Sequence, residues 1–394
     1  MPLTGSSTAD NEIDLIGGTI DVSVEVSPAF NRIEAVWRDL EIRAEAPFFL
    51  SWHWIGAWLL SIDERPGLLL AYDGDRIVGA ALLLVARQWR QHMFAVPTAF
   101  LNQTGDPQRD VITIEFNDVL AECGRETAVR RAVLAFMGSN QMLGADRYDA
   151  FIWRGALRNI EADLVALRLP WRRISATHSA YVDLEAIRCS GRPYLAHLGR
   201  STRHQIRRAC EIYKARGTLT LDVASSVEEA LRFFHAAGAL HQARWEGRGE
   251  PGAFAFPFYI RFHELLIRTG FPVGVVELVR VRAADRAIGY LYNFVFRGRV
   301  SYYFSGFAYE DDNRLKPGLV THSLCVAHHL AAGERVYDFM GGAERYKINL
   351  GQAGPDLIGV VIERRVPMLR LQSTLRRLKR RLEGRSEAGT LGDR

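Results

Sequence analysis

Residues 68–84 read LLLAYDGDRIVGAALLL, two apolar runs on either side of the turn Asp73-Gly74-Asp75. An Asp-Gly pair between two such runs is typical of a tight β-hairpin, because aspartate and glycine tolerate the positive φ angles that this turn requires. The pattern therefore predicts that the two runs are neighbouring antiparallel strands.

The residues before this hairpin predict one strand and two helices. Residues 19–26 alternate between apolar and polar side chains, as a strand does. Ser27 and Pro28 then have the form of a helix N-cap followed by proline in the first turn. A second helix is expected to begin at Ser51.

The same order returns about two hundred residues later. Residues 219–223 alternate, Ser226 and Glu229 form a capping box, residues 258–268 predict a helix, and residues 275–292 predict a second hairpin. Matching features are 199 residues apart for the two helix starts, 205 for the hairpins and 189 for the Tyr-Asp pairs at Tyr148 and Tyr337. The sequence therefore predicts a duplicated α/β unit, a mixed sheet flanked by helices, although such orders also arise by chance.

Composition sets the class of protein. A chain of 394 residues with 48% hydrophobic residues is long enough for two or more cores. From Arg364 onward there are ten Lys and Arg against three acids, so the net charge of +5 leaves residues 1–363 slightly negative. A near-neutral body argues against nucleic-acid binding. No apolar run is long enough to span a membrane, and residues 1–18 do not form a signal peptide, so we expect a cytoplasmic protein.

The four cysteines give no sign of a disulfide framework or a metal site. They are Cys123, Cys189, Cys210 and Cys325, with no CxxC pair. We find no histidine at ligand spacing from them and expect small buried side chains in a reducing compartment. His322 and His329 are seven residues apart without a carboxylate beside them, so we expect no metal.

Five short motifs in the second half occur in the order of a known family. They are Arg200–Arg208, His241–Trp245 with Gly252–Phe254, Tyr303–Phe307, Lys316–Gly318, and Asp338–Gly342 with Glu344–Lys347. They resemble the acetyltransferase family named after cellulose-biosynthesis proteins, which is itself similar to the Fem aminoacyltransferases. The order of elements in each half resembles the acyl-CoA N-acyltransferase (GNAT) plan. The resemblance implies a tandem GNAT-like fold and an acyl-CoA donor, with acetyl-CoA as the first expectation.

The donor is expected at the loop that opens a helix at Pro317. Free N–H groups and the positive end of the helix dipole favour a diphosphate there. The predicted donor-binding residues are Arg314, Lys316, Pro317, Gly318 and Leu319. The alternative is a solvated loop before an ordinary helix start.

Two further groups are candidates for substrate binding. Arg200, Arg203 and Arg207 share one helix face and could bind phosphates or carboxylates, although a solvated basic face is equally expected. Arg244 and Trp245 are candidate walls of the substrate site at the end of another helix. His241, in the same helix, is a candidate general base, whereas a helix-end histidine more often complements the dipole.

The strongest candidates follow a strand expected to end at Met340. Gly341 and Gly342 permit a tight turn with a close approach to the backbone and are predicted to bind substrate. After them, Tyr346 could protonate a leaving thiolate and Lys347 could stabilise an oxyanion. Asp338 is a third catalytic candidate. Tyr303 is preferred to Tyr302 as a polar contact, because Ser301 and Ser305 share its face.

The resulting domain prediction has four parts. Residues 1–18 are a flexible N-terminus, 19–175 a degenerate GNAT-like domain, 176–363 the catalytic GNAT-like domain and 364–394 a basic tail. The resemblance implies an amine or sugar as the acceptor, and polysaccharide or cell-envelope biosynthesis as the pathway. The alternatives are a Fem-like enzyme that uses aminoacyl-tRNA and a non-catalytic assembly protein of the same fold.

The tail predicts an amphipathic helix over residues 367–385. Leu371, Leu375, Leu378 and Leu382 form one narrow stripe among arginines and lysines. Such a stripe suits the surface of an anionic membrane, and equally a site on the protein itself. Peripheral contact with the inner membrane is therefore one expectation for this chain.

Overall fold

The computed structural model describes residues 19–90, 94–140, 142–342 and 345–364. The predicted flexible segment 1–18 and the amphipathic stretch 367–385 lie outside these residues. None of the helices in the described part has the length and apolar character that a membrane crossing requires.

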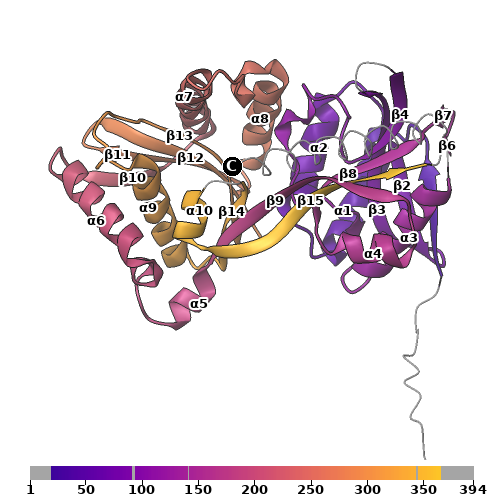
Figure 1. The fold of residues 1–394 in the computed structure, drawn as a ribbon, viewed down its shortest axis with the longest axis horizontal. Helices are drawn as coiled ribbons and strands as arrows, with labels where there is room; N and C mark the ends of the chain where they lie inside the picture. Colours follow the sequence, from indigo (N-terminus) through magenta and orange to yellow (C-terminus); the bar gives the residue numbers. More distant parts are fainter. Residues whose placement is uncertain (1–18, 91–93, 141, 343–344, 365–394) are drawn as a thin grey trace, which may run out of the picture.

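Two sets of elements follow one another along the chain (Figure 1). The first set is β1 (Ile20–Glu25), α1 (Phe30–Arg43), α2 (Trp52–Ser61), β2 (Gly67–Asp73), β3 (Arg76–Arg90), β4 (Phe94–Leu101), α3 (Glu126–Ser139), β8 (Ala150–Leu157), α4 (Ile160–Ala166) and β9 (Trp171–Asp183). The second set is β10 (Leu219–Val223), α7 (Val227–Glu246), α8 (Pro257–Gly270), β11 (Val276–Ala283), β12 (Arg286–Phe296), β13 (Arg299–Phe307), α9 (Pro317–Ala332), β14 (Val336–Gly341), α10 (Arg345–Leu350) and β15 (Gln352–Glu363). The order of strands and helices is the same in both sets.

Shorter elements lie between these. The two sets are joined by α5 (Leu184–Cys189), a 3-10 turn at Tyr194–His197 and α6 (Arg200–Lys214). The first set also contains β5 (Leu120–Ala121), β6 (Met142–Leu143), β7 (Asp146–Arg147) and 3-10 turns at Phe48–Leu50 and Asp110–Ile112. A further 3-10 turn, Ala253–Ala255, follows α7.

One mixed sheet of 13 strands runs through both halves, in the order β1-β2-β3-β4-β8-β15-β9-β14-β13-β12-β11-β10, with β5 beside β3. In each half three antiparallel pairings are followed by a parallel one, β4 with β8 and β13 with β14. The halves therefore have the same strand order and direction, and the predicted duplication is confirmed.

The last strand of each half lies in the other half. β9 pairs with β14, β15 pairs with β8, and the two pair with each other at the centre, where Figure 1 shows them crossing between the halves. This exchange makes the two sheets continuous. The predicted boundary between residues 175 and 176 lies within β9 and stays a prediction.

Equivalent glycines allow the crossover helices to approach the sheet. A Cβ on Gly79 of β3 would lie 2.5 Å from a methyl group of Val129 in α3, and one on Gly289 of β12 would lie 2.5 Å from the hydroxyl of Thr321 in α9. Both glycines stand four residues after an Asp-Arg turn start, at Asp75 and Asp285. Close packing of helix on strand thus has the same physical cause in both halves.

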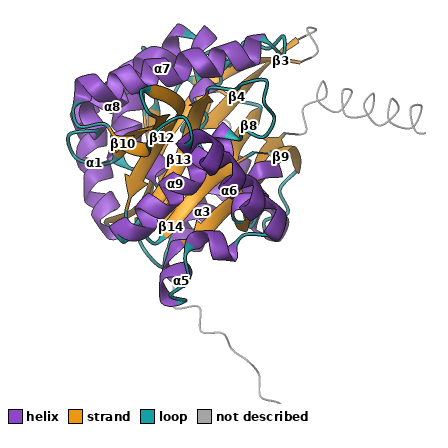
Figure 2. Cartoon of the chain, turned by 90° about the vertical axis from the view of Figure 1, so that its left-hand side faces the viewer, coloured by secondary structure: helices purple, strands orange, loops and turns teal. Residues whose placement is uncertain are grey.

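Helices of the two halves share one core on the face that carries α1, α2, α7 and α8. Trp54 of α2 contacts Phe262 of α8 and Phe294 of β12 through edge-to-face ring contacts. Figure 2 views the molecule from the side of the second half, with α7 and α8 above the strands. Because this core continues from one half to the other, it fixes their relative position.

Three local predictions are wrong. Ser27 has a φ of 48° and does not cap α1, which begins at Phe30 after Ala29. Tyr148 lies just before β8, whereas Tyr337 lies inside β14, so these residues are not equivalent in the duplication. Cys123 and Cys189 are exposed although buried thiols were expected.

Candidate functional site

The parallel strands β13 and β14 separate after three residues. Arg299, Val300 and Ser301 pair with residues 336–338, and no further pairing between these strands follows. β13 continues to Phe307 beside β12, while Gly341 of β14 pairs with β9. The side chains between the separating strands therefore define the candidate site.

Lys347 lies at this point and is buried, with 6% of its surface exposed. Its Nζ donates a hydrogen bond of 2.5 Å to the carbonyl O of Gly341 and lies 5.9 Å from the ring centre of Tyr302. Gly341 N–H in turn donates to Glu115 of the first half, at 2.7 Å. The ammonium group is thus held against the turn that follows β14.

Tyr346 also contacts Tyr302. Its ring stacks on His322 of α9, with centroids 5.4 Å apart, and its hydroxyl donates to the Tyr302 hydroxyl at 3.5 Å. Burial, followed by the charge of Lys347, lowers the pKa of His322 to about 3. His322 is therefore neutral at neutral pH and supports the tyrosine ring.

Asp338 is buried on the face of β14 that lies opposite to the side chains of Tyr337 and Phe339. Its Oδ2 accepts a hydrogen bond of 2.7 Å from Arg299, and its Oδ1 accepts one from the backbone N–H of Met340. Burial raises the pKa of Asp338, while Arg299 lowers it. Met340 has a φ of 61°, so Asp338 holds an uncommon backbone conformation next to the Gly341–Gly342 turn.

His241 reaches β13 from α7. Its Nδ1 lies 3.3 Å from the carbonyl O of Ser305, which only accepts, so Nδ1 carries the hydrogen and Nε2 keeps a lone pair. Burial lowers the pKa of His241. The hydroxyls of Ser305 and Tyr302 are 2.7 Å apart, so Ser305 connects His241 with the tyrosines beside Lys347.

The equivalent place in the first half has a different structure. β4 ends at Leu101, one residue after its pairing with β8, and the chain forms a loop over residues 102–119 before β5 returns to β3. β5 pairs with Gly79 as Phe307 pairs with the equivalent Gly289. The loop is therefore inserted into the strand that corresponds to β13.

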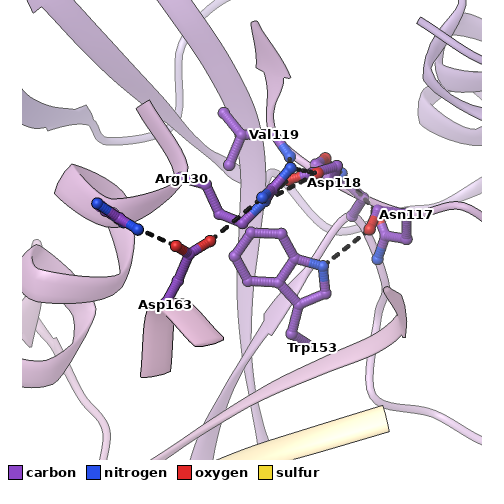
Figure 3. Close-up of polar contacts among 8 residues, drawn as sticks. Asn117, Asp118, Val119, Arg130, Trp153 and Asp163 are labelled. Carbon is purple, nitrogen blue, oxygen red and sulfur yellow. Dashed lines mark hydrogen bonds and ion pairs between the residues drawn. The ribbon is translucent and has the colours of Figure 1, made fainter. Parts of the chain in front are cut away.

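Asn117 of this loop closes the gap between the ends of β4 and β8. Its Nδ2 donates to the carbonyl groups of Leu101 and Arg154, at 3.1 and 3.0 Å, and its Oδ1 accepts from Asn102. The Asn117 carbonyl accepts from the indole of Trp153, as Figure 3 shows. The polar groups of the two strand ends are thus satisfied by the protein itself.

Arg130 of α3 fixes the end of the same loop. It donates to Asp118 at 2.7 Å and to Asp163 of α4 at 3.2 Å (Figure 3). The Arg130 and Asp163 side chains are 8% and 4% exposed. This buried network anchors the loop to α3 and α4.

The predicted donor-binding residues lie where β13 leads into α9. Pro317 is the first residue of α9, and no side chain caps the helix at Lys316. Arg314 forms a bidentate ion pair with Asp312 in its own loop. Gly318 packs beside Phe307, since a Cβ there would lie 3.2 Å from its ring. Leu319 is half-buried in the same turn of α9.

The structure brings Arg244 to this loop, whereas Trp245 packs against His241 and the arginine row lies away from the loop. Arg244 donates to the hydroxyl of Tyr309, at 3.0 Å, and Trp245 lies one residue further along α7. In contrast, the end of α6 is tied to the loop through Arg216 and Glu310, so Arg200 lies at the far end, about 20 Å along the helix. Arg203 and Arg207 lie between these ends.

The structure places the two tyrosines in different surroundings, and the role predicted for Tyr303 stays a prediction. Tyr303 lies in the aromatic core between the halves, and its hydroxyl donates to the carbonyl of Ile112. Tyr302 is the residue beside Lys347 and Tyr346. The prediction depended on which residues of β13 share a face with serines, and this pattern gives no information on which face α10 covers.

A cavity of about 620 Å³ lies between the halves. Its walls come from the 3-10 turn before α2, the end of the inserted loop, and the start of β13. Arg297, Arg299 and Arg335 contribute to it from the second half. Arg299 connects this cavity with the site, because it pairs with Asp338.

Comparison with known proteins identifies the second half. Residues 200–348 match the family model described as "Acetyltransferase (GNAT) domain". The chain contains a GNAT domain. The match begins at α6 and includes β13, α9, β14 and the start of α10, so the residues gathered around Lys347 belong to the GNAT domain. A search of curated protein sequences finds no match.

Solved structures show the same fold over most of the chain. FemX is 11% identical, with a TM-score of 0.54 over 89% of this chain and 99% of its own. The C-terminal domain of a putative lysylphosphatidylglycerol synthetase from Agrobacterium fabrum is 12% identical, with a TM-score of 0.51 over 88% and 96%. L-PGS from Bacillus licheniformis is 11% identical, with a TM-score of 0.51 over 94% and 98%. At this identity the likeness concerns the fold alone, a tandem GNAT fold.

Several residues of the site were not predicted from the sequence. Tyr302, His322 and Ser305 stand in the predicted segments but were given no role beside Lys347, and Glu115 comes from the other half. For Glu115 no sequence signal exists, because 226 residues separate it from Gly341. The expectation that no histidine lies at ligand spacing from a cysteine is wrong for Cys325, because His329 follows it four residues later on the same helix, and both have ligand atoms close to Glu277.

Proposed function

We propose that the protein is an acyltransferase that uses acyl-CoA, with its reaction at the separating ends of β13 and β14. The observation that carries the proposal is the difference between the two halves. In the first half the strand ends are joined through Asn117, whereas in the second half Lys347, Tyr346 and Tyr302 gather there. The first half thus provides support and the second half the chemistry.

The amino end of α9 suits the diphosphate of the donor. Its first N–H groups have no partner within the helix, and the helix dipole is positive there. Lys316 adds a positive charge at the same end. A donor bound there would direct its thioester along β13 toward Tyr302.

Each candidate side chain has one step to perform. An acceptor amine attacks the thioester carbonyl, the C–N bond forms as the C–S bond breaks, and in net one proton passes from the amine to the thiolate. Tyr346 is placed to protonate the thiolate, Lys347 to stabilise the oxyanion, and neutral His241 to take the proton of the amine. Acetyl is the acyl group we test first.

Replacing Gly318 by valine is expected to weaken acyl-CoA binding at least tenfold. The new side chain would press against Phe307 and displace the N–H groups at the start of α9. Isothermal titration with acetyl-CoA measures the effect, and Ala332→Val at the exposed far end of α9 is the control. Equal affinity in the Gly318 variant would place the donor elsewhere.

The acceptor is proposed to enter from the side of the cavity between the halves. Arg297, Arg299 and Arg335 favour an acceptor with a phosphate or carboxylate, such as a nucleotide-linked amino sugar. Thermal-shift measurements with amino sugars and their nucleotide-linked forms test this proposal. A rise in Tm with charged tRNA but not with acyl-CoA would instead favour an aminoacyltransferase. If no ligand raises the Tm, a non-catalytic assembly protein is favoured.

A cytoplasmic enzyme held at the inner membrane by residues 367–385 is also proposed. The tail is the basic part of an otherwise near-neutral chain. Co-sedimentation with anionic vesicles should occur at low salt, decrease as salt is added, and be lost when the chain is cut after Pro367. Full-length protein that stays in the supernatant at low salt would refute the membrane contact.

A further inference from the structure

Three side chains with metal-binding atoms meet between α9 and β11. Glu277 of β11 and Cys325 and His329 of α9 have ligand atoms that all lie within 4.8 Å of one another. Cys325 and His329 are buried, and the Glu277 side chain is 13% exposed. Because Cys325 and His329 are four residues apart, one face of α9 presents both to β11.

Asn293 of β12 supports two of these groups at once. Its Nδ2 donates to Glu277 Oε1 at 2.9 Å and to Cys325 Sγ at 3.5 Å. Its Oδ1 is buried without a hydrogen-bond partner in the described part of the protein. If the Asn293 amide were flipped, its Oδ1 would face the Glu277 carboxylate, and two acceptors would then lie against each other. The amide is therefore oriented by two acceptor atoms, the Glu277 Oε1 and the Cys325 Sγ.

A buried ion pair explains only part of this arrangement. His329 Nε2 lies 3.0 Å from Glu277 Oε1, and such a pair would join α9 to β11. The ion pair does not explain why the Cys325 sulfur lies close to both groups, or why the Asn293 amide donates to both the sulfur and the carboxylate. A cation bound by all three side chains accounts for every one of these contacts.

The ligand set selects the type of ion. Thiolate, imidazole and carboxylate together suit zinc, whereas magnesium and calcium prefer oxygen ligands alone. A thiolate and a carboxylate also balance the two positive charges. His328, with 39% of its side chain exposed and Nε2 4.0 Å from Glu277 Oε2, lies on the solvent side of the cluster.

We propose that Glu277, Cys325 and His329 bind one zinc ion that fixes α9 to β11. On binding, the thiol proton and any proton on the imidazole pass to solvent. Cys325 lies eight residues after Pro317, about 12 Å along the helix from the proposed donor site. The ion would therefore hold the helix that presents the donor site without contacting the donor.

Cobalt titration of the full chain, freed of metal with a chelator, tests the proposal. We expect one equivalent of Co²⁺ to bind with a thiolate-to-cobalt charge-transfer band, and zinc to displace it. In Cys325→Ser the band should be lost and zinc should bind at least tenfold more weakly. Glu277→Gln should weaken zinc binding in the same way but keep the thiolate band.

Cys210→Ser on α6 is the matched control, because this half-buried thiol lies outside the cluster. It should keep both the band and the zinc affinity. Zinc should also raise the Tm of the wild type and of this control, but not that of Cys325→Ser. The proposal is overturned if the folded wild type binds neither metal, or if Cys325→Ser binds zinc as the wild type does. Circular dichroism establishes folding of each variant.

Discussion

Lys347→Ala is expected to lower kcat/KM more than tenfold, which corresponds to about 1.4 kcal/mol of transition-state stabilisation. The ammonium is buried and held between the Gly341 carbonyl and the Tyr302 ring, where its charge is poorly screened. Release of CoA from acetyl-CoA, with the best acceptor of an amino-sugar panel, measures the effect. Wild-type turnover in this variant would refute the proposed site.

Two further variants separate chemistry from structure. Tyr346→Phe keeps the stacking on His322 but removes the hydroxyl that donates to Tyr302, so kcat should fall while the Tm changes little. Ile348→Ala changes the exposed neighbour of Lys347 on α10 and should leave turnover unchanged. If Lys347→Ala lowers the Tm strongly and its loss of turnover is explained by the loss of folded protein, the lysine supports the fold and does not act in the reaction.

Arg130→Met should lower the free energy of unfolding by about 3 kcal/mol, because it removes the ion-pair partner of Asp118 and leaves buried Asp163 with only the exposed Arg131. Arg130 joins Asp118, at the end of the inserted loop, to Asp163 of α4. Burial raises the pKa of Asp118 even though Arg130 opposes this shift, so removal of the arginine makes the charged form still less favourable. Urea denaturation followed by tryptophan fluorescence measures the loss.

Arg131→Met is the control for this prediction. Arg131 donates to the same Asp163 at 2.7 Å, but half of its side chain is exposed. A pair with an exposed partner contributes less than about 1 kcal/mol, because water and salt screen it. Equal losses in the two variants would show that burial does not set the strength of this network.

The hairpins, the capping at Ser226 and the order of elements could be predicted from the sequence, because each depends on residues close in the chain. Ser226 accepts from Glu229 N–H as predicted, whereas the Glu229 carboxylate accepts from Ser225 and not from Ser226. The helix α9 ends at Gly333 in the left-handed conformation. Tyr346 and Lys347 could be chosen for the same reason, since they follow a strand and a glycine turn.

Three features could not be predicted: the exchange of β9 and β15, the hydrogen bonds by which Asn117 joins the ends of β4 and β8, and the contact of Glu115 with Gly341. They join residues up to 226 positions apart and depend on how the two halves pack. The same holds for the position of Tyr302 rather than Tyr303 beside Lys347, which depends on the face that α10 covers. The sequence by itself determined the repeated units and their local turns, because short-range backbone preferences act there. Only the tertiary structure decided which repeat keeps its strand ends apart, because an inserted loop satisfies those backbone groups in the first half and not in the second.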